Sequence, residues 1–352
     1  MKIILAFDSF KGCLSAPDVC NAACEGIKSV SPKAEVVSLP LSDGGEGLVN
    51  FFLSLGKAIR IQVRVHGPLM EKVLATYALS EDGQTAYMEM ASVCGLTLVP
   101  IEKRDVMKAT TFGLGELLLD VKKRGVTHIV LGIGGSATCD AGIGMLEALG
   151  NDTLDGILLT VACDVTNPLY GYDGAAYVFA PQKGASPEQV KLLDERLRSF
   201  ARHTEEKGFA VSSDAMKPGT GAAGGLGYAL QTYLHAQLQS GIDIILDACS
   251  FDRVLDAADL VITGEGCSDS QTVRGKVAAG VLRRAKKHQV KTVLMSGQIK
   301  DREILQDYGF DYLACVNESD GRPLDQLLQP AVATGNIRDC AKRLISKFFM
   351  EK

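Results

Sequence analysis

The pattern that most restricts the fold of this chain is a short apolar run, then a loop rich in glycine, serine and acidic residues, then an amphipathic segment. Short apolar runs are typical of strands, and amphipathic segments are typical of helices. The runs comprise residues 2–7, 35–39, 127–131, 259–262 and 291–295. Since strands that alternate with helices form parallel sheets, the pattern predicts an α/β protein with a mostly parallel sheet.

The middle of the chain begins differently. Three closely spaced apolar runs, at residues 60–65, 73–77 and 85–90, have a Glu-Asp-Gly turn between the last two. This arrangement predicts an antiparallel meander. We therefore expect a parallel domain built from residues 1–60 and 250–352, with a mixed α/β domain of residues 61–249 inserted between its two parts.

Composition excludes several classes of protein. The formal net charge of −5 disfavours nucleic-acid binding, and no apolar run approaches the 18 residues of a membrane span. The short apolar run before Asp8 is typical of a first strand rather than a signal peptide. Ten cysteines without a C-x-x-C pair indicate small core residues in a reducing compartment. These features predict a cytoplasmic protein that binds neither nucleic acid nor membrane.

Charged residues follow several of the predicted strands. Ligands of α/β sheets bind at the carboxyl ends of the strands, so these side chains are expected at one rim. Carboxylates there suit Mg²⁺, lysine offsets phosphate charge, and glycine lets backbone N–H groups approach oxygens. A single loop is equally explained as a turn with capping residues, but so many acids at one edge favour a phosphate site. The polar residues concerned are Asp8, Lys11, Asp43, Glu46, Glu265, Asp269, Ser296 and Gln298.

Residues 132–140, GIGGSATCD, allow two interpretations: a tight turn or a backbone cradle for phosphate. The chain has no G-x-x-x-x-G-K-[ST] motif, and the G-x-G-x-x-G letters at 219–224 do not follow a clear strand. Asp164 and Asn167 lie just after the predicted strand at 157–162, and Lys183 lies in a loop. The five glycines of residues 219–227 permit close approach, either to a ligand or to another segment.

These stretches together resemble the bacterial glycerate kinase family of the type that lacks a P-loop. The matching pieces occur in the family's order over nearly the whole chain, at residues 8–12, 42–47, 110–117, 132–138, 163–169, 181–184, 221–227 and 263–276. The resemblance implies a flavodoxin-like domain, an inserted mixed domain and an active site in the cleft between them. It also implies transfer of the γ-phosphoryl group of ATP to D-glycerate with Mg²⁺, usually to give 2-phosphoglycerate.

Roles for individual residues follow as hypotheses. Asp164 is the favoured catalytic base and Asp8 the next candidate, while Lys11 and Lys276 neutralise phosphate or the glycerate carboxylate. The metal candidates are Asp43, Glu265 and Asp269. The remaining candidates for binding substrate or phosphate are Ser9, Gly134, Gly135, Ser136, Thr138, Asn167, Lys183, Gly224, Gly225 and Gln271. A homodimer is left open.

The sequence also departs from the family pattern. Family members usually carry a few tens of residues more between Gly150 and Leu158. Other departures are Cys139 for Asn, Ala141 for Gly, Cys267 and Ser268 for Arg and an apolar residue, and Ala278 for Pro. Two alternatives therefore remain: a kinase of another small hydroxy acid, and a non-catalytic metabolite-binding regulator derived from the kinase.

Overall fold

Two compact units make up the chain, one from Met1–Asp43 with Ile242–Lys352 (unit 1) and one from Gly44–Gly241 (unit 2). The computed structural model describes residues 1–42, 47–273, 275–318 and 320–349. The division differs from the expected boundaries at residues 60 and 250. Helix α2 (Leu48–Ser54) packs on strands of unit 2, and Ile242 in α9 (Gly241–Ala248) packs against Gly280 of unit 1.

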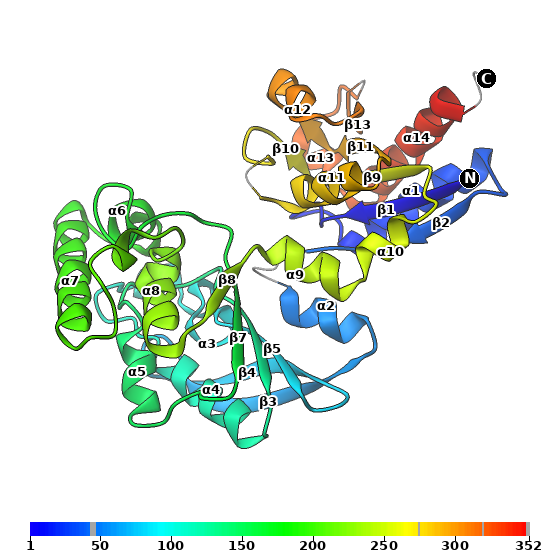
Figure 1. The fold of residues 1–352 in the computed structure, drawn as a ribbon. Helices are drawn as coiled ribbons and strands as arrows, with labels where there is room; N and C mark the ends of the chain where they lie inside the picture. Colours follow the sequence, from blue (N-terminus) through cyan, green and yellow to red (C-terminus); the bar gives the residue numbers. More distant parts are fainter. Residues whose placement is uncertain (43–46, 274, 319, 350–352) are drawn as a thin grey trace. The chain divides into compact units, whose positions relative to one another are not determined.

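Five parallel strands form the sheet of unit 1, in the order β13-β11-β9-β1-β2 (Figure 1). The strands are β1 (Lys2–Phe7), β2 (Glu35–Ser38), β9 (Leu260–Gly264), β11 (Lys291–Ser296) and β13 (Tyr312–Cys315). The runs of apolar residues in β1, β9 and β11 are almost wholly buried, as expected for strands covered on both faces. The predicted parallel sheet is confirmed.

Helices cover both faces of this sheet. Helices α1 (Ala16–Val30) and α14 (Pro330–Phe349) pack together against one face, and α11 (Val277–Lys287) packs against the other. Helix α1 begins as its sequence predicts, because the side chain of Ser15 accepts the N–H of Asp18. The smaller elements are α10 (Phe251–Leu255), α12 (Arg302–Tyr308), α13 (Leu324–Leu327), β10 (Cys267–Ser268) and β12 (Gln298–Ile299).

Unit 2 contains a six-stranded mixed sheet in the order β3-β4-β5-β6-β7-β8. Its strands are β3 (Ala58–His66), β4 (Lys72–Ser80), β5 (Thr85–Glu89), β6 (His128–Gly132), β7 (Leu158–Ala162) and β8 (Gln237–Gln239). Strands β3, β4 and β5 pair antiparallel, which confirms the predicted meander, and β5 to β8 pair in parallel. Strand β8 was not predicted, because a strand of only three residues has too short a pattern to recognise.

The core of unit 2 lies between its sheet and helices that include α4 and α8. A second cluster joins α6, α7 and α8. The helices are α3 (Ala91–Cys94), α4 (Phe112–Lys123), α5 (Ile143–Leu149), α6 (Ala175–Phe179), α7 (Pro187–Glu206) and α8 (Ala222–Leu234), with short 3-10 turns at Leu96–Leu98, Ile101–Lys103, Pro181–Lys183 and Asp214–Met216.

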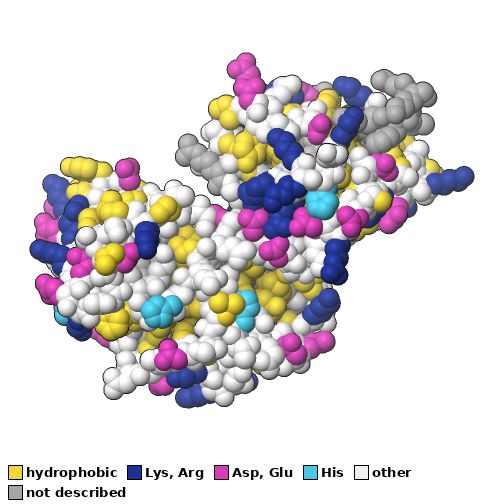
Figure 2. All heavy atoms as spheres, in the orientation of Figure 1, with side chains coloured by type: hydrophobic (Ala, Val, Ile, Leu, Met, Phe, Trp, Pro, Cys, Tyr) yellow, Lys and Arg dark blue, Asp and Glu magenta, His cyan; other side chains and the backbone are white. Residues whose placement is uncertain are grey.

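The surface charges and the helix lengths can be compared with the expectations for nucleic acid and membrane binding. On the face drawn in Figure 2, acidic and basic side chains of the described residues are interspersed over the units. No helix in the described part of the chain combines the length and the apolar character needed to cross a membrane.

Candidate functional site

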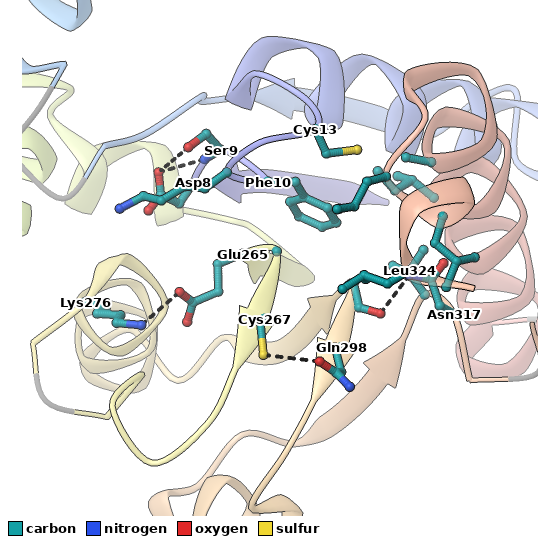
Figure 3. Close-up of a pocket in the computed structure, with 18 residues that line it drawn as sticks. Asp8, Ser9, Phe10, Cys13, Glu265, Cys267, Lys276, Gln298, Asn317 and Leu324 are labelled. Atoms are coloured by element: carbon teal, nitrogen blue, oxygen red, sulfur yellow. Dashed lines mark hydrogen bonds and ion pairs between the residues drawn. The ribbon is translucent and has the colours of Figure 1, made fainter. Parts of the chain in front are cut away.

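A cavity of about 370 Å³ lies in unit 1, at the carboxyl ends of β1, β9, β11 and β13 (Figure 3). Connections from β1 and β9 lead to helices on opposite faces of the sheet, α1 and α11. In doubly wound sheets, ligands bind where neighbouring strands diverge in this way. The position of the cavity therefore makes it the candidate ligand site of unit 1.

Five predicted site residues, Asp8, Ser9, Lys11, Glu265 and Lys276, line this cavity. Asp8 and Glu265 occupy adjacent strand ends, because Phe7 pairs with Gly264 in the parallel register. Asp8 is buried, and its Oδ1 accepts the N–H of Ser9 at 2.7 Å. The cavity thus combines two carboxylates and two lysines.

Glu265 is held by three side chains. Its Oε1 accepts hydrogen bonds from the hydroxyls of Thr272 at 2.6 Å and Ser268 at 3.3 Å. Its Oε2 lies 3.3 Å from the ammonium group of Lys276, which precedes α11. This network fixes the carboxylate at the cavity wall and leaves the lysine, whose side chain is 41% exposed, able to meet an anion.

The other metal candidates lie elsewhere. The Oδ1 of Asp269 accepts the N–H of Gln271 at 2.8 Å, so both residues belong to a turn beside Glu265 rather than to the cavity lining. Asp43 lies outside the described residues. Within the described ranges, no three His, Cys, Asp or Glu side chains come together as a metal site.

A second group of predicted residues gathers in unit 2, at the carboxyl end of β6. The Gly135 oxygen accepts the N–H of Leu96 at 2.8 Å, so the loop of Gly134–Ser136 is tied to the segment after α3. The ammonium group of Lys183 donates to the Oγ of Ser136 and to the backbone oxygen of Thr138, both at 2.7 Å. Lys183 is therefore a support of this loop, not the solvated turn residue that its local sequence allows.

Burial changes the chemistry of this lysine. Only 2% of Lys183 is exposed, and burial lowers the pKa of Lys183 to about 8. The hydroxyl of Thr138 is also buried and makes no hydrogen bond within the described structure. The loop thus has a polar interior that is sealed from solvent.

The glycine-rich segment of unit 2 serves close packing. Gly224 and Gly225 have φ of 69° and 91°, and a Cβ at Gly224 would overlap the backbone oxygen of Thr138. The oxygen of Gly224 also accepts the N–H of Ala141 at 3.0 Å. Approach to another segment, one of the two alternatives that the sequence left open, is therefore observed at Gly224.

The loop after β7 carries the remaining candidates. The Oδ1 of Asp164 accepts the N–H of Gly241 at 3.1 Å, and Asp164 is exposed. The Nδ2 of Asn167 donates to the oxygen of Asp173 at 2.7 Å. Since β6 and β7 are parallel neighbours, this loop and the Gly134–Ser136 loop lie at one edge of the sheet.

Two of the unusual residues have clear structural consequences. Ala141 has φ of 56°, in the left-handed region that favours glycine. Ser268 is buried and links Glu265 to Ser296, because its Oγ lies 2.8 Å from the Oγ of Ser296. The substitution at 268 therefore contributes a polar contact to the cavity wall.

Sequence reasoning missed much of the cavity lining. Asn317 and several apolar residues from α13 and α14 contribute to its wall. Apolar side chains in an amphipathic helix look the same in sequence whether they face a core or a cavity. Asn317 follows the last strand, as ligand-binding residues of α/β sheets do, and that position was the available signal.

The chain matches one family model. The model of the glycerate kinase family matches residues 3–157 and 151–348. The two matched pieces overlap at residues 151–157, in the segment where a departure from the family pattern is expected from the sequence.

The chain is also similar to named proteins over most of its length. The chain is 42% identical to a glycerate kinase of Bacillus subtilis (strain 168) over 89% of each chain. It is 40% identical to a glycerate 2-kinase of Escherichia coli (strain K12) over 94% of each chain. A crystal structure of a Salmonella typhimurium LT2 protein assigned as glycerate kinase 2 superposes with a TM-score of 0.84 at 37% identity, covering 100% of this chain and 99% of that one.

Proposed function

The chain belongs to the glycerate kinase family, as its motifs predicted, and we propose that it phosphorylates the 2-hydroxyl of D-glycerate with ATP. Glycerate kinases are ATP-dependent phosphotransferases, so the reaction class follows from the family. The choice of the 2-hydroxyl is supported by the similarity to the Escherichia coli glycerate 2-kinase. The single observation that carries the proposal is the cavity that combines Asp8, Lys11, Glu265 and Lys276 at the strand ends of unit 1.

The phosphates of ATP are proposed to bind in this cavity, beside its lysines and carboxylates. Phosphoryl transfer depends mainly on positioning and on neutralising negative charge. Lys276 and Lys11 supply positive charge, and Lys276 is held ready by Glu265 at 3.3 Å. The donor set also fits Mg²⁺, which in proteins binds through one or two carboxylates together with substrate phosphates. Glu265 is the residue that would hold it, joined by Asp8 on the adjacent strand end if Asp164 is the base.

Removal of the proton from the acceptor hydroxyl is assigned to an aspartate. A carboxylate beside the hydroxyl takes its proton as the oxygen attacks the γ-phosphorus and the bond to the β-phosphate oxygen breaks. Asp164 is the favoured base and Asp8 the alternative. The Gly134–Ser136 loop, supported by Lys183, is proposed to position an anionic group through its backbone N–H groups.

The finer fold class is part of the proposal. Counted within unit 1, the strand order is 2-1-3-4-5, the order of flavodoxin-like sheets. We propose that units 1 and 2 are its flavodoxin-like and inserted domains. A homodimer is the proposed assembly, to be tested by light scattering.

A coupled assay of ADP release with D-glycerate, ATP and Mg²⁺ tests the activity, and NMR of the product identifies the phosphorylated hydroxyl. We expect 2-phosphoglycerate. Formation of 3-phosphoglycerate would overturn the choice of hydroxyl, and preference for another hydroxy acid would overturn the substrate. Binding of D-glycerate without turnover would favour a regulator.

A further inference from the structure

The cavity of unit 1 has two chemically different ends. Figure 3 shows Asp8, Glu265 and Lys276 at one end, Leu324 and Asn317 at the other, and Phe10 between them. The apolar part of the lining comprises Phe10, Val316, Leu324, Leu327, Leu328 and Ile337. A ligand that fills the whole cavity therefore needs charged or polar groups at one end and apolar surface at the other.

The leucines of the apolar end are unusually open to solvent. Leu324 is 66% exposed and Leu328 is 40% exposed, although both line the cavity. Helix α13, which carries Leu324, has four residues and packs on α14. Exposed apolar side chains grouped at a concave site mark a ligand surface, because burying them under a ligand removes them from water.

Asn317 adds a fixed polar group to the same end. Its Nδ2 donates to the backbone oxygen of Gly297 at 3.0 Å, and its Oδ1 accepts from Asn336 at 2.8 Å. Asn336 is held in turn by Asp320, whose Oδ2 lies 2.9 Å away. A mostly apolar wall with a few fixed polar groups is typical of small-molecule and cofactor sites.

We propose that the apolar end of this cavity holds the base of the nucleotide phosphoryl donor, with Leu324, Leu328 and Ile337 covering its ring. The inference rests on the proposed function, in which the phosphates occupy the charged end. Of the two substrates, only the nucleotide has an aromatic group, since glycerate is small and polar throughout. A volume of about 370 Å³ also falls within the range of ligand pockets.

Binding of two probes separates base recognition from phosphate recognition. ADP carries the base, whereas inorganic tripolyphosphate has only phosphates. In the double variant Leu324→Asn/Leu328→Asn, calorimetry with constant Mg²⁺ should show ADP bound about tenfold more weakly, because the base loses apolar contacts. Tripolyphosphate affinity should change less than twofold. Because both leucines are exposed, their replacement should leave the fold intact, and circular dichroism checks this.

Leu192→Asn is the matched control, because Leu192 is 43% exposed on α7 in unit 2 and does not line the cavity. It should leave ADP affinity unchanged. Unchanged ADP affinity in the double variant, or equal losses for ADP and tripolyphosphate, would overturn the inference. A higher KM for D-glycerate at saturating ATP, without weaker ADP binding, would do the same. If the wild-type protein fails to phosphorylate D-glycerate while the ADP result holds, the proposed function fails and the base site stands.

Discussion

The buried ammonium group of Lys183 lies 2.7 Å from the hydroxyl oxygen of Ser136, in the loop that follows β6. The same group donates to the backbone oxygen of Thr138, so one side chain from a 3-10 turn supports the loop from behind. Replacing Lys183 with Met leaves both acceptors buried without a donor, at a cost of about 1–3 kcal/mol each, partly offset by removal of a buried charge.

We expect Lys183→Met to lower kcat/KM for D-glycerate at least about 100-fold, because a displaced positioning loop has a large effect on phosphoryl transfer. Lys217→Met, at a lysine that is 59% exposed and paired with Asp214 in the same unit, is the control and should retain activity. Steady-state kinetics measure both variants. Activity near the wild-type level in the folded Lys183 variant would show that the loop does not need this support.

The stability of the protein should depend on pH through Lys183. Burial lowers the pKa of Lys183 to about 8, against 10.5 for an ordinary lysine. Between these values the unfolded chain binds more protons than the native state, so the free energy of unfolding rises with pH. Urea titrations of the wild type and Lys183→Met at pH 7.5, 9 and 10 should show the wild type gaining up to about 3 kcal/mol relative to the variant. A difference that stays constant across this range would contradict the burial of a charged lysine.

Replacing Glu265 with Gln removes the negative charge that holds Lys276. We expect the Mg²⁺ concentration for half-maximal activity to rise at least about tenfold, since a neutral amide is a weaker ligand for a hard cation. The KM for D-glycerate should stay within about twofold. Glu303→Gln, on the exposed surface of α12, is the control. Unchanged Mg²⁺ dependence would remove Glu265 from the metal role.

Replacing Asp164 with Asn tests the proposed base. A general base contributes about 10²–10⁴-fold to turnover, so kcat should fall by at least about 100-fold while ADP affinity is retained. Asp173→Asn changes another exposed aspartate in the segment after β7 and should have little effect. If Asp164→Asn turns over normally, the corresponding variant of Asp8 becomes the next test of the base.

The sequence predicted one end of the cavity and missed the other. The carboxyl ends of parallel strands meet at one edge, so Asp8 and Glu265 were expected together although 257 positions separate them. The apolar end depends on how α13 and α14 pack, and the leucines there carry no local signal that distinguishes them from core residues. Lys183 is a similar case. Its local sequence is compatible with a solvated turn, and its burial depends on contacts with Ser136 and Thr138, which lie far away in the sequence.

For the fold too, local features were predicted from the sequence and features that depend on long-range packing were not. Local patterns predicted β1, the start of α1 at Ser15 and the antiparallel meander, and these are confirmed. Strand order and the limits of the two units depend on contacts between segments far apart in the chain. Helix α2 illustrates this, because its packing on β4 and β5 places it in unit 2.

The packing of the glycine-rich segment on the loop after β6 gives a sharp test of its role. Gly224 and Gly208 both have positive φ, of 69° and 79°, but a Cβ at Gly208 meets nothing within 4 Å. Gly208→Ala should cost only about 1 kcal/mol, the penalty for alanine in the left-handed region. Gly224→Ala carries the same penalty and also forces the Thr138 backbone away, so we expect a loss of at least about 3 kcal/mol by urea denaturation. Equal losses in the two variants would show that the close approach at Gly224 does not constrain the loop.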